Sequence, residues 1–144
     1  MSTSLYLMPY TKGDWQIEPN AFIKALKQFW PGVKIHFITN PEEGYLLEWT
    51  YRWPSSSEMD GLLDRDLQRI VFSGGGAGIA RCATFGLWLQ KLYPEAKHLL
   101  LFDQQLSFDI IIDGRTVDEI VQLAQSHYSY TDLLEEEENE KQSP

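Results

Sequence analysis

The stretch of this chain with the clearest capacity for chemistry is a glycine-rich loop at residues 73–78. Its sequence is Ser73-Gly74-Gly75-Gly76-Ala77-Gly78, so four glycines fall within five positions. Glycine permits tight turns and close approach of the backbone because it has no Cβ. A helix that begins after this loop would point free backbone N–H groups at a phosphate, pyrophosphate or carboxylate. The candidate anion-binding residues are therefore Ser73, Gly74, Gly75, Gly76 and Gly78.

The residues around this loop narrow what it can bind. A Walker loop requires Lys followed by Ser or Thr after its last glycine, whereas Ile79 and Ala80 follow here. The spacing of the glycines also differs from the dinucleotide-binding fingerprint. The alternative to an anion site is a flexible crossover into a helix that is packed too closely for side chains.

One family shares part of this pattern. The Gly76-x-Gly78 pair after a predicted strand is similar to the pyrophosphate loop of GNAT-type acetyltransferases. That similarity would imply a small group transferase that binds a phosphate-bearing cofactor at residues 74–78. The second half of the chain lacks the helix usually found between the last strands of that family, so we assign no family and no cofactor.

A second group of candidates lies between residues 53 and 66. Trp53 ends a strand-like aromatic pattern, and an exposed tryptophan favours a protein interface. A cluster of acids in this region could dock a basic partner, although solvated loop charge is the plainer interpretation. The spacing of these acids does not match a calcium-binding loop. Four acids surround the single base Arg65: Glu58, Asp60, Asp64 and Asp66.

The remaining reactive side chains form no catalytic or metal-binding pattern. Cys82 falls on an apolar helix, where cysteine usually behaves as a small hydrophobe. The histidines fall on three separate elements without the spacing of metal ligands. Three aspartates flank the last predicted hairpin and could form paired carboxylates, although turn residues are the plainer interpretation. They are Asp103, Asp109 and Asp113. We assign no catalytic residue and no metal ligand.

Composition and charge limit the classes of protein to which this chain can belong. The 144 residues are 43% hydrophobic and 13% aromatic, which suits one folded domain with a core. The formal net charge is −9, of which −5 falls in residues 132–144 and −4 in the rest of the chain. An acidic chain without a basic stripe argues against direct nucleic-acid binding. The same charge permits a basic protein partner.

The sequence also indicates a compartment. One cysteine allows no intrachain disulfide, which favours a reducing environment. The N-terminal residues do not show the pattern of a signal peptide, and the apolar runs are too short to span a bilayer. We therefore expect a cytoplasmic protein that binds no membrane.

Hydrophobic periodicity predicts the elements that position these candidates. Alternating or continuous apolar residues predict strands at 4–10, 33–39, 45–53, 67–72, 97–103 and 107–113. Helical spacing predicts one helix from Pro19 to the Pro31-Gly32 stop, a buried helix at 78–92, and a last helix capped by Thr116 and Glu119. In the strand at 45–53, Tyr45 and the other odd-numbered residues are expected on one face. The segment 58–66 fits a loop, a helical turn or the arm of a hairpin.

The resulting order is β-α-β-β-β-α-β-β-α, which predicts the α+β class. We expect a two-layer sandwich in which three helices cover a mostly antiparallel or mixed sheet of about six strands. A ferredoxin-like core is one arrangement that fits this order. Residues 1–130 form a single globular domain in this interpretation, and residues 131–144 form an acidic, disordered tail.

Three functions from different classes fit these observations. The first is a small acidic cytosolic domain that binds a basic protein without catalysis, for example an immunity or antitoxin protein. The second is the acetyltransferase-like group transferase with its cofactor at residues 74–78. The third is a homo-oligomeric structural subunit, such as a homodimer formed through a sheet edge or the region of Trp53. The missing catalytic pattern and the acidic balance place the binding protein first.

Overall fold

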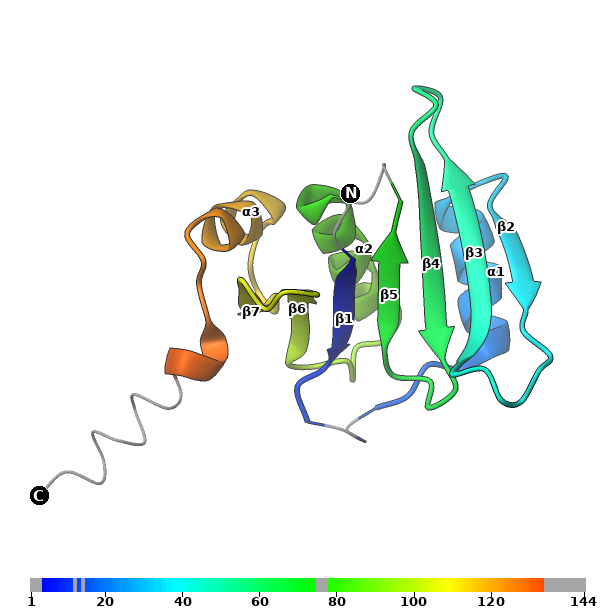
Figure 1. The fold of residues 1–144 in the computed structure, drawn as a ribbon, viewed down its shortest axis with the longest axis horizontal. Coiled ribbons are helices and arrows are strands. Elements are labelled where there is room, and N and C mark those ends of the chain that lie inside the picture. Colours follow the sequence, from blue (N-terminus) through cyan, green and yellow to red (C-terminus); the bar gives the residue numbers. More distant parts are fainter. Residues whose placement is uncertain (1–3, 12, 14, 75–77, 134–144) are drawn as a thin grey trace, which may run out of the picture.

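The computed structural model describes residues 4–11, 13, 15–74 and 78–133. Within these ranges, seven strands form one sheet in the order β2-β3-β4-β5-β1-β6-β7 (Figure 1). The strands are β1 (Leu5–Pro9), β2 (Lys34–Phe37), β3 (Tyr45–Arg52), β4 (Glu58–Asp64), β5 (Ile70–Ser73), β6 (Leu99–Asp103) and β7 (Asp109–Ile111). The helices are α1 (Pro19–Phe29), α2 (Ile79–Leu92) and α3 (Val117–Gln125).

The structure confirms the α+β class and the antiparallel character of the sheet, with seven strands where about six were expected. The additional strand is β4, which the sequence left undecided. Its residues alternate in burial, with Met59, Gly61 and Leu63 buried between more exposed neighbours. Every neighbouring pair of named strands is antiparallel. The two-layer sandwich and the ferredoxin-like order are not confirmed and stay predictions.

Capping residues and a proline start two of the helices at the positions that the sequence predicts. Pro19 occupies the first turn of α1, and the carboxylate of Glu18 accepts a hydrogen bond from a backbone N–H of that turn. Thr116 and Glu119 form the predicted capping box of α3, in which each side chain bonds the backbone of the other residue. Gly78 precedes α2 as its N-cap residue and offers no side-chain cap.

The helices divide the sheet into a covered face and an open face. Both α1 and α2 lie on the same side of the sheet, behind it in Figure 1, and α3 packs against α2. Strand residues on that side, such as Leu7 and Leu101, are buried. The alternate residues point to the opposite side, which we call the open face. Around β1 and β6, the open face carries the half-buried side chains Tyr6, Met8, Leu100 and Phe102.

The aromatic stripe of β3 faces the helices except at its first residue. Trp49 is buried and lies over its partner in the β3–β4 ladder, Gly61. A bulge between Tyr45 and Leu47 shifts the register, and Tyr45 lines a pocket together with the exposed Glu48. The expectation that Tyr45 shares the face of Leu47 is wrong, because a bulge adds one residue to the pairing and reverses the alternation.

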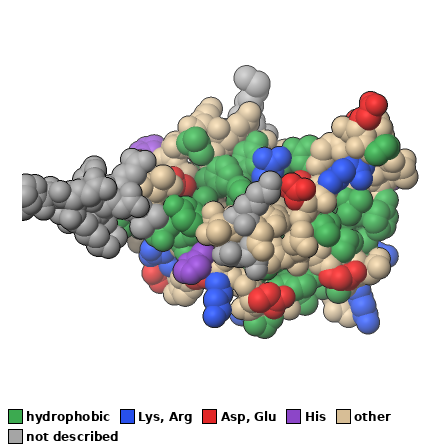
Figure 2. Space-filling view, turned by 90° about the horizontal axis from the view of Figure 1, so that it is seen from below, with side chains coloured by type: hydrophobic (Ala, Val, Ile, Leu, Met, Phe, Trp, Pro, Cys, Tyr) green, Lys and Arg blue, Asp and Glu red, His purple; other side chains and the backbone are tan. Residues whose placement is uncertain are grey.

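The surface carries charges of both signs. Seen from below, acidic and basic side chains are interspersed with hydrophobic ones and form no basic stripe on that side (Figure 2). The described part of the chain contains no helix with the length and apolar character needed to cross a membrane. Residues 134–144, which make up most of the predicted acidic tail, lie outside the described residues.

The contact between Trp49 and Gly61 generates a test of the sheet. A Cβ at Gly61 would overlap the indole ring of Trp49. We therefore expect Gly61→Ala to lower the free energy of unfolding by about 1–3 kcal/mol, as overpacked core substitutions do, although alanine is otherwise the better strand residue. Urea denaturation followed by circular dichroism measures the change.

Gly44→Ala is the matched control for this substitution. A Cβ at Gly44 would meet no atom within 4 Å, so its effect should stay within about 0.5 kcal/mol. Equal stability of the two variants would contradict the packing argument.

Candidate functional site

In the described part of the glycine loop, the structure requires glycine at one position. Ser73 is the last residue of β5, and Gly74 adopts a φ of +102°. A Cβ at Gly74 would lie 3.0 Å from the carbonyl oxygen of Glu58 on β4, so the close approach of two strands requires glycine there. At Gly78 a Cβ would meet nothing within 4 Å. Gly75 and Gly76 lie outside the described residues, and the anion site remains a prediction.

Trp53 packs against its neighbours and lies close to the beginning of α2. The guanidinium of Arg81 lies 3.7 Å from the centroid of the Trp53 ring, and that ring forms T-shaped contacts with the rings of Trp30 and Tyr51. A small pocket of about 180 Å³ is lined by Trp53, Arg81 and the end of α1. Trp53 is therefore half-buried in an aromatic cluster, and the guanidinium of Arg81 lies over its ring.

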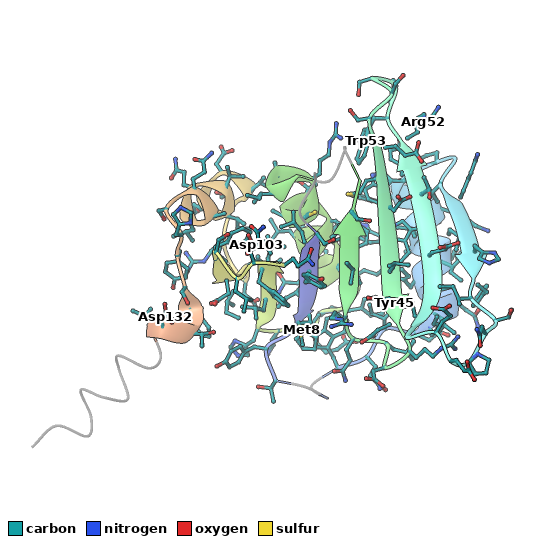
Figure 3. All side chains as sticks on the ribbon, in the orientation of Figure 1. Met8, Tyr45, Arg52, Trp53, Asp103 and Asp132 are labelled. Atoms are coloured by element: carbon teal, nitrogen blue, oxygen red, sulfur yellow. The ribbon has the colours of Figure 1, made fainter. Side chains whose placement is uncertain are left out.

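The four acids of the predicted docking patch fall into two separate places. Glu58 forms an ion pair of 2.8 Å with Arg52, and the carboxylate of Asp60 accepts a hydrogen bond of 2.7 Å from Thr50. Both pairs lie at the end of the sheet that holds Trp53, whereas Tyr45 and its partner Asp64 lie at the opposite end (Figure 3).

Of the other two acids, Asp64 ends β4 and Asp66 lies in the turn that follows. The carboxylate of Asp64 accepts hydrogen bonds from the backbone N–H groups of Gln68 and Arg69. The carbonyl oxygen of Asp66 accepts one from the side chain of Gln16. Glu58 and Asp60 therefore lie at the same end of the sheet as Trp53, but their side chains pair with Arg52 and Thr50 on the open face, whereas Trp53 contacts the helices on the covered face. Asp64 and Asp66 lie at the other end of the sheet.

Two of the three hairpin aspartates hold the turns around β6 and β7. Asp113 accepts hydrogen bonds from the backbone N–H groups of His98 and Leu99 and from the side chain of Gln90. Asp103 is buried and accepts hydrogen bonds from the backbone and the hydroxyl of Ser107. Their carboxylates thus accept the hydrogen bonds of backbone N–H groups at strand ends, as the interpretation of these aspartates as turn residues predicted. Among the described residues, no group of three or more His, Cys, Asp or Glu side chains is placed to hold a metal ion.

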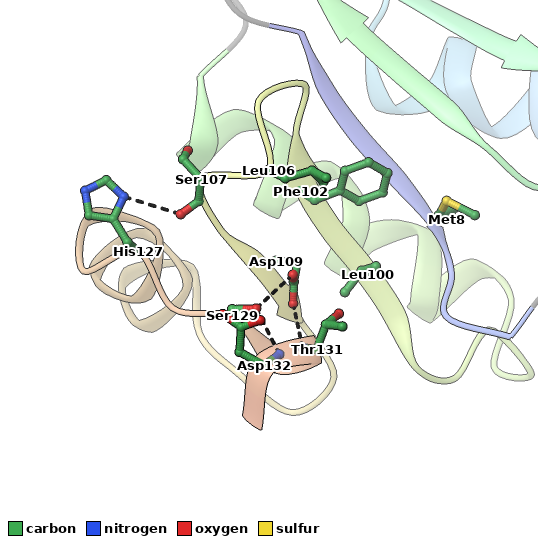
Figure 4. A pocket seen from close by; sticks show the side chains of 10 residues that line it. All are labelled: Met8, Leu100, Phe102, Leu106, Ser107, Asp109, His127, Ser129, Thr131 and Asp132. Carbon is green, nitrogen blue, oxygen red and sulfur yellow. Dashed lines mark hydrogen bonds between the residues drawn. The ribbon is translucent and has the colours of Figure 1, made fainter. Parts of the chain in front are cut away.

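The third aspartate, Asp109, borders a groove that the sequence did not reveal. This groove of about 420 Å³ lies on the open face, between β1, β6, β7 and residues 127–132 (Figure 4). Its apolar lining comes from Met8 on β1 and from Leu100 and Phe102 on β6. Its volume is within the range of about 300–1,000 Å³ that small-ligand sites occupy.

The C-terminal segment forms one wall of this groove and is fixed to β7. The backbone N–H of Asp109 donates to the carbonyl of Tyr128 at 3.0 Å. The Asp109 carboxylate accepts hydrogen bonds from the hydroxyl of Ser129 at 3.1 Å and the N–H of Thr131 at 3.0 Å (Figure 4). The Ser129 hydroxyl in turn accepts from the N–H of Asp132 at 3.1 Å. These bonds fix the Asp109 carboxylate and the backbone of residues 129–132 at the groove, which the Asp132 side chain also lines.

The rim of the groove combines acidic charge with an exposed apolar side chain. Its lining contains Asp109, Asp132 and His127 and contains neither lysine nor arginine. Leu106, in the turn between β6 and β7, is 68% exposed and adopts a φ of +55°.

The signals that could have revealed the groove were divided along the chain. The alternation in the strand at 4–10 puts Met8 on the side opposite Leu5 and Leu7, whereas the continuous apolar centre of the strand at 97–103 distinguishes no face for Leu100. Nothing local indicated that β1 and β6 are neighbours or that residues 127–132 return to β7. The candidate carboxylate Asp109 was therefore paired with Asp113 in the sequence, whereas its hydrogen bonds in the structure go to the C-terminal segment.

Comparison of the chain with protein-family models, with curated proteins and with solved structures finds no match. The interpretation of the groove therefore depends on its own residues.

The buried thiol generates a prediction about reactivity and pH. Burial raises the pKa of the Cys82 thiol to about 12, whereas an unfolded cysteine titrates near 8.5. The native thiol should stay protonated at pH 8 and react with Ellman's reagent much more slowly than the chain in urea, because the thiolate is the nucleophile. The absorbance of the released thiol product follows both reactions.

The same shift gives a pH dependence of stability. The unfolded chain releases the thiol proton at lower pH than the folded chain, so unfolding is favoured as the pH rises from about 9 to about 12. Below pH 8 the thiol makes no contribution, because both states are protonated. Cys82→Ala should remove this part of the pH profile. If Ellman's reagent labels the native protein as fast as it labels the unfolded chain, the prediction that the Cys82 thiol is buried is wrong.

Proposed function

We propose that this protein is a non-catalytic, cytosolic binding domain for a basic protein, built as a two-layer α+β sandwich that docks its partner on the open face. An immunity or antitoxin protein, which blocks a basic toxin by binding it, is a concrete version of this function. Such a protein needs a rigid surface whose charge is opposite to that of its target.

The observation that carries the proposal is the groove on the open face. It joins an apolar floor, Met8, Leu100 and Phe102, to a rim with the acids Asp109 and Asp132. Protein interfaces combine an apolar centre with a polar rim in the same way. The neighbouring Leu106 extends the apolar area into solvent.

The net charge of the chain supports the same class of partner. A formal charge of −9 attracts a basic protein over distances of about a Debye length and raises the rate of association. The carboxylates of Asp64, Asp103 and Asp113 bind backbone N–H groups of turns. These three acids therefore support the scaffold. Asp109 also holds residues 129 and 131, but it lines the groove where a partner would bind, as Asp132 does.

The proposal predicts a direct complex whose affinity depends on salt. The full-length chain, tagged and expressed in the cells it comes from, should retain a basic protein on copurification. The two purified proteins should then bind each other in isothermal titration calorimetry. Raising the salt from 50 to 300 mM should weaken binding severalfold, because screening reduces the attraction between opposite charges.

Other outcomes would favour the alternatives. Thermal stabilisation by millimolar coenzyme A esters or nucleotides, without a protein partner, would favour the group transferase. A concentration-dependent dimer in light scattering would favour the structural subunit. Absence of any binary complex between the purified proteins would overturn the proposed function.

A further inference from the structure

We infer that the groove on the open face receives one lysine or arginine side chain of the partner. This inference rests on the proposed function and deepens it, because it names the chemical group that is recognised. The aliphatic stem of that side chain would lie along Met8, Leu100 and Phe102. Its cationic head would lie between the carboxylates of Asp109 and Asp132, which border the same groove.

The apolar floor suits the stem of a long basic side chain. Lysine and arginine bury three or four methylene groups along apolar surface while their charge stays in contact with water. Phe102 stacks on Tyr6 with a centroid distance of 5.1 Å, which fixes its ring within the floor. The ring of Phe102 also lines the groove, so a cation can lie near an aromatic ring as well as near the acids.

The two carboxylates retain the capacity to accept further hydrogen bonds. Each oxygen of Asp109 accepts one described hydrogen bond, whereas a carboxylate offers about four acceptor positions. Asp132 takes part in the described hydrogen bonds through its backbone N–H. Within the described ranges, neither carboxylate forms an ion pair with a lysine or arginine of this chain.

The fixed position of the Asp109 carboxylate distinguishes the groove from ordinary surface charge. The chain of hydrogen bonds through Ser129 ties Asp109 to the segment that carries Asp132. A carboxylate that is already held in place, as that of Asp109 is, binds a cation with less loss of side-chain freedom than a mobile surface acid does. The acids also repel phosphate groups, which favours a protein cation over a nucleic acid as the occupant.

The test uses small probes that carry only the proposed group. N-acetyl-L-arginine amide and N-acetyl-L-lysine amide carry the cation, and N-acetyl-L-citrulline amide has nearly the shape of the arginine probe without its charge. Methyl NMR of the full-length protein follows Met8, which lines the groove, and Met59, which is buried in the core. We expect both cationic amides, at millimolar concentration, to shift the Met8 methyl signal and leave Met59 unchanged. The citrulline amide should bind more weakly.

Two charge-neutralising variants separate local recognition from general attraction. Asp132→Asn should weaken binding of the arginine probe about two- to fivefold, the range expected for an exposed ion pair. Glu48→Gln removes the same charge from the open face on β3, four strands and roughly 19 Å from β6. Binding by the Glu48→Gln variant should match the wild type.

Each other result overturns the inference. It fails if the cationic amides leave Met8 unshifted, if the citrulline amide binds equally well, or if both variants weaken binding alike. A partner that binds wild type and Asp132→Asn with equal affinity would also refute it, while the proposed function would stand. If no partner forms a binary complex, the proposed function fails, and the amide titration still decides whether the groove binds a basic side chain.

Discussion

The rest of this structure depends on the packing of Phe85 against aromatic rings from α1, from α2 and from the sheet. Phe85 lies on α2 and is fully buried. Six aromatic rings surround it with centroid distances of 5.1–6.3 Å. Because these rings belong to both helices and to two strands, their burial places α1 and α2 together over β3 and β5. They are Phe22, Phe29, Trp30, Trp49, Phe72 and Trp88.

This one-sided packing has a direct consequence for the open face. The aromatic residues of α1, α2 and β3 are largely used on the covered face, and α3 also packs on that side through α2. The strands β1 and β6 therefore present Met8, Leu100 and Phe102 to a side without these helices, where the side chains are only half-buried. The hydrogen bonds of Asp109 bring the C-terminal segment alongside them. The groove thus forms on the side of β1 and β6 that the helices leave uncovered, where the C-terminal segment is bonded to β7.

Sequence patterns predicted those parts of the fold that depend on near neighbours. Pro19 and the capping box at Thr116 mark helix starts through contacts within one turn, so both were recognisable. The strand β4 was left undecided because Gly61 and its acids interrupt the apolar pattern, and its burial depends on pairing with β3 and β5. The groove depends on more distant pairings still. Its walls come from β1, β6, β7 and residues 127–132, and no local spacing records their order.

Acid density along the sequence and acidity available to a partner are different properties in this protein. Glu58 and Asp60 are close in sequence, and cross-strand partners on β3, Arg52 and Thr50, engage both of them. Such pairs stabilise the ladder by fractions of a kcal/mol, up to about 1 kcal/mol each. The Arg52 guanidinium offsets the charge of Glu58, whereas the Thr50 hydroxyl leaves Asp60 charged. Asp109 and Asp132 are 23 positions apart, yet the fold brings them to one groove that no lysine or arginine lines. In the proposed function, the acids that a partner would recognise are those that line the apolar groove and have no lysine or arginine partner within the described residues.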